Sequence, residues 1–221
     1  MWGSSSKKSS SGSSAANSNF DAAGATALFN KYVDAEEDPF IVDMDGISTL
    51  CDDLNLDPTS DIRVLVLMFK LGANAKPGEI SQSEWNSGMS DLSCGSIEDV
   101  KSRLAGMDTG FMEHSEFKKF YKFVFQFSRE GTHRTIEKDM VTALLQMVLG
   151  DRNNVHLNSF CEFLEQSGEE AIRITLDQWT SFLEFSVSIG EDCVGYEDDE
   201  NCAWPVLLDE YVAWKQKSLK K

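Results

Sequence analysis

Hydrophobic residues recur at steps of three and four along most of the chain, which is the spacing of one helix face. Five stretches show this spacing most clearly: residues 62–69, 100–107, 140–148, 160–164 and 179–183. The chain has four prolines, and no Asn-Gly or Asp-Gly turn joins two alternating runs as in a β-hairpin. The pattern therefore predicts an all-α fold.

Sequence signals for helix starts stand before several of these stretches. Residues 81–84 and 175–178 fit the capping box, in which a Ser or Thr and a Glu or Gln three positions later satisfy each other's backbone donors. Residues 96–99 form a weaker version. Pro205 suits the first position of a last helix, where its missing N–H costs nothing.

Two stretches of the chain resemble each other. Residues 79–85 and 173–179 share an isoleucine, a capping residue, a Glu or Gln and a tryptophan in register, as a short strand entering a helix would. Residues 40–47 and 155–160 are interpreted as their partners. Four such units form two pairs, which is the geometry of EF-hands.

This interpretation sets the expected domain organisation. We expect one domain over residues 20–217, built of two EF-hand-like lobes packed together. The first lobe is expected over about 25–128 and the second over about 129–217, with a serine-rich disordered tail over 1–19 and a short tail over 218–221.

The EF-hand-like loops lack most of the ligands that calcium needs. Such a loop takes side-chain oxygens at positions one, three and five, glycine at six and glutamate at twelve. Gly78 and Glu84 fit the last two positions of the second unit, but its first three ligand positions are Ala73, Ala75 and Pro77.

The first unit departs from the pattern in the opposite way. Acids stand at its ligand positions, as Asp34, Glu36 and Asp38, whereas Pro39 replaces the glycine and Asp45 replaces the glutamate. We therefore expect degenerate, metal-free loops and no cofactor.

Charge narrows the classes of partner. The chain has 221 residues and a net charge of −17, from 20 basic and 37 acidic residues, so a nucleic-acid partner is not expected. Lysines and aromatic residues alternate over residues 117–127, but we interpret that stretch as a buried helix with one polar stripe (118, 122, 126). No apolar run approaches the roughly 18 to 20 residues of a membrane span, so no membrane partner is expected.

Five widely spaced cysteines without a Cys-x-x-Cys pair are typical of reduced thiols, so we expect an intracellular protein of the nucleus, the cytoplasm or both. No Walker pattern, glycine-rich phosphate loop or Gly-x-Ser-x-Gly elbow is present. The sequence therefore indicates no catalytic residues and no enzyme.

An acidic stretch near the C-terminus stands out. Residues 174–214 hold ten acids and no lysine or arginine, and aromatic residues alternate with the acids. A solvated helix face accounts for such a run when it stands alone. The interleaved aromatic residues indicate instead a folded acidic face, suited to a basic partner with an apolar anchor.

Four stretches together resemble the potentiating-neddylation domain of the defective-in-cullin-neddylation family. They are Ile47–Leu54 with Asp57-Pro58, Gly88-Met89 through Cys94-x-Ser96-Ile97-Glu98, the aromatic stretch Phe117–Phe127, and Ala203–Asp209, which reads Ala-Trp-Pro-Val-Leu-Leu-Asp. The resemblance runs from about residue 25 to 216.

The resemblance implies a non-catalytic scaffold co-ligase. Members of the family bind the C-terminal winged-helix region of a cullin and the N-acetylated terminus of the neddylation-conjugating enzyme. They help a RING ligase component to transfer the ubiquitin-like modifier to the cullin. The family's acidic cullin-binding patch carries over onto Asp177, Ala203 and Asp209.

The resemblance also implies a pocket for the acetylated methionine of the conjugating enzyme. That pocket carries over onto Val64, Cys94, Phe127, Leu144 and Met147, with Leu144 standing where close relatives have a tyrosine.

Two other classes of function compete with this interpretation. A calcium-responsive EF-hand-like protein would open an apolar groove on binding metal, but the ligand count above argues against it. An enzyme without a local signature would need a cysteine and a histidine that converge in an open cleft.

Overall fold

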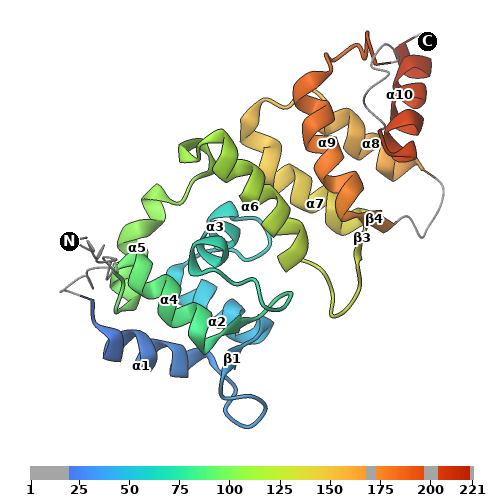
Figure 1. The fold of residues 1–221 in the computed structure, drawn as a ribbon. Coiled ribbons are helices and arrows are strands. Elements are labelled where there is room, and N and C mark those ends of the chain that lie inside the picture. The colour runs from blue at the N-terminus through green and yellow to red at the C-terminus, as the bar shows by residue number, and fades with distance from the viewer. Residues whose placement is uncertain (1–19, 168–172, 197–203, 220–221) are drawn as a thin grey trace, which may run out of the picture.

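A computed structural model describes residues 20–167, 173–196 and 204–219, and it confirms the all-α class (Figure 1). The first half of the chain holds the following elements: α1 (Ala22–Tyr32), β1 (Ile41–Val42), α2 (Met44–Leu54), α3 (Ile62–Leu71), β2 (Ile80–Ser81), α4 (Gln82–Leu92), α5 (Ile97–Arg103) and two 3₁₀ turns, η1 (Leu104–Gly106) and η2 (Thr109–Phe111). The second half holds α6 (His114–Phe127), β3 (Thr135–Glu137), α7 (Lys138–Leu149), the 3₁₀ turn η3 (Gly150–Arg152), α8 (Leu157–Gln166), β4 (Arg173–Thr175), α9 (Leu176–Ser188) and α10 (Val206–Leu219).

The first lobe is a pair of helix–strand–helix units. Strands β1 and β2 pair antiparallel, and the sequence predicted them as partners. The register is shifted by one residue from the expected one, because Val42 rather than Ile41 lies opposite Ile80. Trp85 on α4 is buried and donates from Nε1 to the carbonyl of Ala25 on α1, at 2.9 Å. Helices α3 and α4 cross closely at Gly88, where a Cβ would lie 2.4 Å from Cα of Leu71.

The second lobe repeats this plan with a different strand pairing from the one expected. Strand β4 pairs antiparallel with β3, with Ile174 opposite Ile136. The expectation that residues 155–160 supply the partner strand is wrong, because Leu157 begins α8 and His156 precedes it. Trp179 on α9 matches Trp85, since its Nε1 donates to the carbonyl of Tyr121 on α6, at 2.8 Å.

Helix α6 lies between the two lobes and packs against both α3 and α9. Phe69 of α3 contacts two of its rings, with centroids 5.5 Å from Phe120 and 5.4 Å from Phe123. On the other side, Tyr121 stacks on Trp179 at 4.4 Å. Lys118, Lys122 and Gln126 form the exposed stripe that the sequence predicted.

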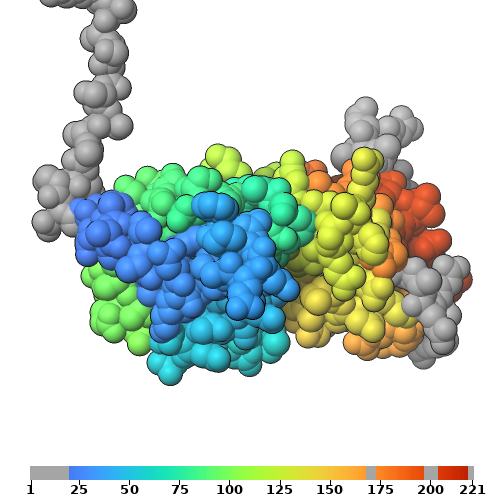
Figure 2. All heavy atoms as spheres, turned by 90° about the horizontal axis from the view of Figure 1, so that it is seen from below, coloured from blue at the N-terminus to red at the C-terminus, as the bar shows by residue number. Residues whose placement is uncertain are grey.

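The described molecule is elongated, with the first lobe at one end and the second at the other (Figure 2). Among the described residues, none of the helices combines the length and hydrophobicity needed to cross a membrane.

The capping signals that the sequence predicted at helix starts are present in the structure, and one predicted helix start is shifted by one residue. Full capping boxes form at Ser81, Ser96 and Thr175. Helix α10 begins at Val206, so Pro205 lies just before the first helical residue rather than at it. Cys51, Cys94, Cys161 and Cys193 are free and buried, and Cys202 lies outside the described residues.

Candidate partner-binding surfaces

Two acids of the expected cullin-binding patch lie in the first turns of neighbouring helices. Asp177 is the second residue of α9 and Asp209 the fourth of α10, and both are exposed. Helices α9 and α10 pack against each other. An acid in a first helical turn is favoured by the helix dipole, which explains why exposed carboxylates are stable there. Ala203, the third patch residue, lies outside the described residues.

The Asp209 carboxylate has a fixed neighbour. The hydroxyl of Tyr196 donates to Asp209 Oδ1 at 2.6 Å, and the Tyr196 ring packs edge-on against Phe185 of α9, with centroids 5.7 Å apart. Burial and the adjacent carboxylate raise the pKa of Tyr196 well above its usual range, so the phenol stays protonated and continues to donate. The segment that leaves α9 therefore orients an acid on α10.

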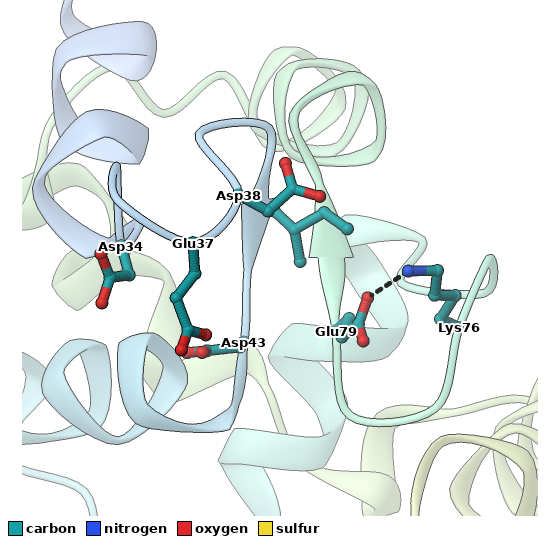
Figure 3. Close-up of a pocket in the computed structure, with 7 residues that line it drawn as sticks. Asp34, Glu37, Asp38, Asp43, Lys76 and Glu79 are labelled. Atoms are coloured by element: carbon teal, nitrogen blue, oxygen red, sulfur yellow. Dashed lines mark ion pairs between the residues drawn. The ribbon is translucent and has the colours of Figure 1, made fainter. Parts of the chain in front are cut away.

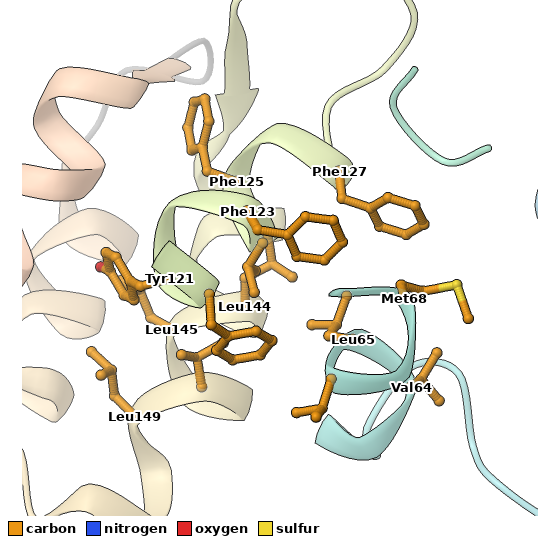
Figure 4. Close-up of a cluster of buried hydrophobic side chains, with 14 of the residues drawn as sticks. Val64, Leu65, Met68, Tyr121, Phe123, Phe125, Phe127, Leu144, Leu145 and Leu149 are labelled. Atoms are coloured by element: carbon orange, nitrogen blue, oxygen red, sulfur yellow. The ribbon is translucent and has the colours of Figure 1, made fainter. Parts of the chain in front are cut away.

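Most of the expected peptide-pocket residues come from three helices that meet between the lobes. Val64 lies on α3, Phe127 at the end of α6, and Leu144 and Met147 on α7. Figure 4 shows Val64, Phe127 and Leu144 within one apolar cluster. The exposed fractions are 5% for Val64, 7% for Phe127 and 5% for Leu144, whereas Met147 is half-buried.

Cys94 comes from a fourth element, the turn after α4. It is fully buried, and its thiol lies 3.5 Å from the carbonyl oxygen of Leu92. Burial raises the pKa of the Cys94 thiol, and the nearby Arg103 opposes that rise. The thiol therefore behaves as a small apolar group rather than a nucleophile.

Leu65, Met68 and Phe123 belong to the same cluster but were not expected there (Figure 4). Met68 lies four positions after Val64 on α3, and Phe123 lies four positions before Phe127 on α6. Helical spacing places such positions on the same face, so the spacing could have identified Met68 and Phe123, whereas Leu65 directly follows Val64 in the chain.

A surface hollow lies at the loop of the first unit (Figure 3). Its lining includes Asp34, Glu37, Asp38, Asp43 and Glu79. Three of these carboxylates accept backbone N–H groups at 2.9 Å, Asp34 from Glu36, Asp38 from Phe40 and Asp43 from Gly46. Among the described residues, no group of three acidic, histidine or cysteine side chains is placed to hold a metal ion.

A carboxylate connects the loop of the second unit to the start of α4. Glu84, at the twelfth position, accepts the backbone N–H groups of Asn74 and Ala75 through Oε1, at 2.8 and 2.7 Å. Its Oε2 accepts from the N–H and the hydroxyl of Ser81, at 2.9 and 2.7 Å. Burial favours the neutral acid, but these hydrogen bonds outweigh it and lower the pKa of Glu84.

Comparison with known proteins decides the family. The family model described as cullin binding matches residues 99–214. DCN1-like protein 4 of Drosophila melanogaster is 35% identical over 188 residues, which cover 85% of this chain and 73% of that protein. DCN1-like protein 5 of Rattus norvegicus is 34% identical over 190 residues, covering 86% and 76%. DCN1-like protein 3 of Xenopus laevis is 34% identical over 196 residues, covering 87% and 62%.

The chain belongs to the cullin-binding family. The region that the family model matches contains all three acidic-patch positions as well as Phe127, Leu144 and Met147. Val64 and Cys94 precede it. Membership in the cullin-binding family indicates a cullin as partner and an accessory, neddylation-related role.

Proposed function

We propose that this chain is a non-catalytic scaffold co-ligase for cullin neddylation. It binds the C-terminal winged-helix region of a cullin through Asp177, Ala203 and Asp209. It binds the N-acetylated terminus of the neddylation-conjugating enzyme through Val64, Cys94, Phe127, Leu144 and Met147. The observation that carries the proposal is the family match, together with the exposure of both patch acids on packed helices.

A scaffold of this kind works by proximity. Holding the conjugating enzyme and the cullin at once makes transfer to the acceptor lysine effectively intramolecular, within a complex that includes the RING ligase component. The two proposed sites lie on different parts of the molecule, the patch on α9 and α10 and the cluster around α3, α6 and α7. Both partners could therefore be bound together without competing for one surface.

The acidic patch is tested by truncating its carboxylates. We expect Asp177→Ala and Asp209→Ala each to weaken cullin binding, because each strands a basic group of the partner. The loss runs from about 2 to 5 kcal/mol for a desolvated pair and is much smaller for a pair at the rim. Affinity for cullin C-terminal regions and thermal melting are measured together. Asp45→Ala is the matched control, since Asp45 is an exposed acid in the first turn of α2 in the other lobe.

The patch is also tested for its electrostatic character. Ala203→Arg adds bulk and a like charge against a basic partner and should be at least as damaging as either truncation. Affinity should fall with added salt, because exposed charge pairs are screened over roughly 8 Å at physiological ionic strength. An Asp177→Ala, Asp209→Ala double variant that folds and binds cullin normally would place the docking surface elsewhere.

The apolar cluster is tested with two forms of one peptide. A free amino terminus is a charge that is costly to bury, whereas an acetylated one is neutral. We expect the acetylated N-terminal peptide of the conjugating enzyme to bind at least about tenfold more tightly than the free form, a difference of about 1.4 kcal/mol. Met147→Ala should weaken binding of the acetylated peptide. Met140→Ala changes an exposed methionine of the same helix and should leave that binding unchanged. Equal affinities for the two peptides would refute this part of the proposal.

A further inference from the structure

A buried polar cluster joins α8 to α10. It consists of His156 and Ser159 at the start of α8 and of Tyr211 and Lys215 on α10. His156 and Tyr211 are fully buried, and Lys215 is 7% exposed. Among the described residues no carboxylate forms an ion pair with Lys215. A buried lysine without an acid is costly, so its polar neighbours must compensate for the charge.

The hydrogen bonds of the cluster specify one form of the histidine. His156 Nε2 lies 3.0 Å from the carbonyl oxygen of Ile189, the residue that ends α9. A carbonyl only accepts, so Nε2 carries the proton and Nδ1 of the neutral ring is an acceptor. Nδ1 then accepts from the hydroxyl of Tyr211 at 2.9 Å. The neutral ring thus connects the end of α9 with α10.

Lys215 completes the network through oxygen atoms. Its ammonium donates to Ser159 Oγ at 3.2 Å and to the Tyr211 hydroxyl at 3.4 Å, and it lies 3.5 Å from His156 Nδ1. The Ser159 and Tyr211 hydroxyl oxygens are 2.6 Å apart. A proton on Nδ1 would remove the acceptor of Tyr211 and set a second positive charge beside Lys215.

Some of the groups around His156 lower its pKa and others raise it. Burial lowers its pKa, and Lys215 on α10 lowers it further, whereas the carbonyl of Ile189 and the carboxylate of Glu191 after α9 raise it. Tyr211 remains protonated, because burial holds its pKa well above the usual range. Burial also keeps the neighbouring thiols of Cys193, after α9, and Cys161, on α8, neutral by raising their pKa.

We infer that neutral His156, through Tyr211 and Lys215, is a positioning residue that holds α10 in place and so presents Asp209 for docking. The inference rests on the proposed function only in its last step.

The pH dependence of this stabilisation has a definite sign, because the pKa of His156 is lowered in the folded protein. The stabilisation is complete above the pKa of an unfolded histidine, about 6.5. It is lost as the pH falls through the lower pKa of the folded protein.

The first measurement is amide hydrogen exchange over residues 206–219, corrected for the intrinsic effect of pH on exchange. We expect protection of α10 in the wild type to fall at least about threefold between pH 7.5 and 5.5. His156→Gln retains a donor and an acceptor but cannot be protonated, so its protection should change little with pH. His114→Gln, the same change at an exposed histidine, should behave as the wild type. Equal pH dependence in the wild type and His156→Gln would overturn the inference.

Lys215→Met supplies a second variant in case His156→Gln fails to fold. Replacing a buried ammonium that has no acidic partner among the described residues by an apolar chain of similar length need not destabilise the protein. It removes the charge that opposes protonation of His156, so the pH dependence of α10 protection should shrink. If Lys215 only filled space, Lys215→Met would leave the pH dependence of α10 protection as it is in the wild type. That result would contradict the inference.

The second measurement is cullin affinity of the same proteins at both pH values. Titration of the cullin itself affects all variants alike. The ratio of the cullin affinity of the wild type to that of His156→Gln therefore reports only the effect of the buried polar cluster. We expect the wild type to lose at least about threefold more affinity than His156→Gln between pH 7.5 and 5.5. An unchanged ratio, with exchange still dependent on His156, would refute the link to docking. Normal binding by Asp209→Ala at pH 7.5 would instead refute the proposed docking site and leave the exchange result standing.

Discussion

At the scale of single residues, two buried tyrosines differ in what their hydroxyl groups contact. Tyr121 is fully buried in α6, and its hydroxyl has no hydrogen-bond partner among the described residues. Tyr211 is equally buried, but its hydroxyl contacts both His156 and Ser159. An unsatisfied buried hydroxyl costs free energy, whereas a bonded one contributes to stability.

We therefore expect Tyr121→Phe to leave the free energy of unfolding unchanged or to raise it by about 1 kcal/mol. The ring and its stacking on Trp179 remain in this variant. Tyr211→Phe is the matched control and should lower the free energy by about 0.5 to 1.5 kcal/mol. Urea unfolding measures both. A larger loss for Tyr121→Phe than for Tyr211→Phe would mean that the Tyr121 hydroxyl is satisfied in solution.

At the scale of elements, side chains within the strand–helix units hydrogen-bond to the loop and to the helix start of the same unit. The same side chain, Glu84, caps α4 and ties the loop before it through four hydrogen bonds. Gln178 occupies the equivalent position in α9 and, among the described residues, accepts from Thr175, through its N–H at 2.8 Å and its hydroxyl at 3.1 Å. The positions equivalent to Asn74 and Ala75 lie outside the described residues. The Glu84 carboxylate therefore connects the loop at Asn74 and Ala75 to the start of α4.

Glu84→Gln should lower the free energy of unfolding at pH 7 by about 1 to 2 kcal/mol, because charge-assisted bonds become neutral ones. The folded pKa of Glu84 is lowered, so its contribution is complete above the unfolded value of 4.5. It is lost as the pH falls through the folded pKa. The difference between variant and wild type should thus shrink in acid. Glu130→Gln, at an exposed loop residue, serves as the control, and a difference that stays constant with pH would contradict this account.

At the scale of the whole molecule, α6 couples the two lobes. Its aromatic rings contact α3 on one side and α9 on the other. Further ties cross the same region, since the N–H of Gly78 donates to the carbonyl of Phe127 at 2.9 Å. The guanidinium of Arg152 lies 3.7 Å above the ring of Phe117. Two lobes that share one buried helix are expected to unfold together.

We expect a single unfolding transition, with coincident changes in tryptophan fluorescence and far-ultraviolet circular dichroism. Phe123→Ala should destabilise the protein by about 3 to 5 kcal/mol, because Phe123 is 3% exposed and packs between α3 and α6. Phe111→Ala, at a ring that is 75% exposed, should stay within about 0.5 kcal/mol. Two separate transitions in the wild type would show that the lobes unfold independently.

The sequence by itself determined what depends on neighbours along the chain. Helical spacing, the capping boxes at Ser81 and Thr175, and the positions of the first two strands follow from residues a few positions apart or from short motifs. The acidic stretch also indicated a basic partner, and the family resemblance implied a cullin, before any contact was known. Which residues form the docking patch and the peptide pocket stays a prediction, since it rests on resemblance.

Only the tertiary structure decided what depends on residues far apart. Strand β4 pairs with residues 135–137 rather than 155–160, because pairing is set by how the helices pack and not by local pattern. Helix α6 serves both lobes because its rings cover more than one face. His156 and Lys215, 59 positions apart, meet only when α8 and α10 pack. Spacing predicts which face a residue shares, but packing alone determines what lies opposite that face.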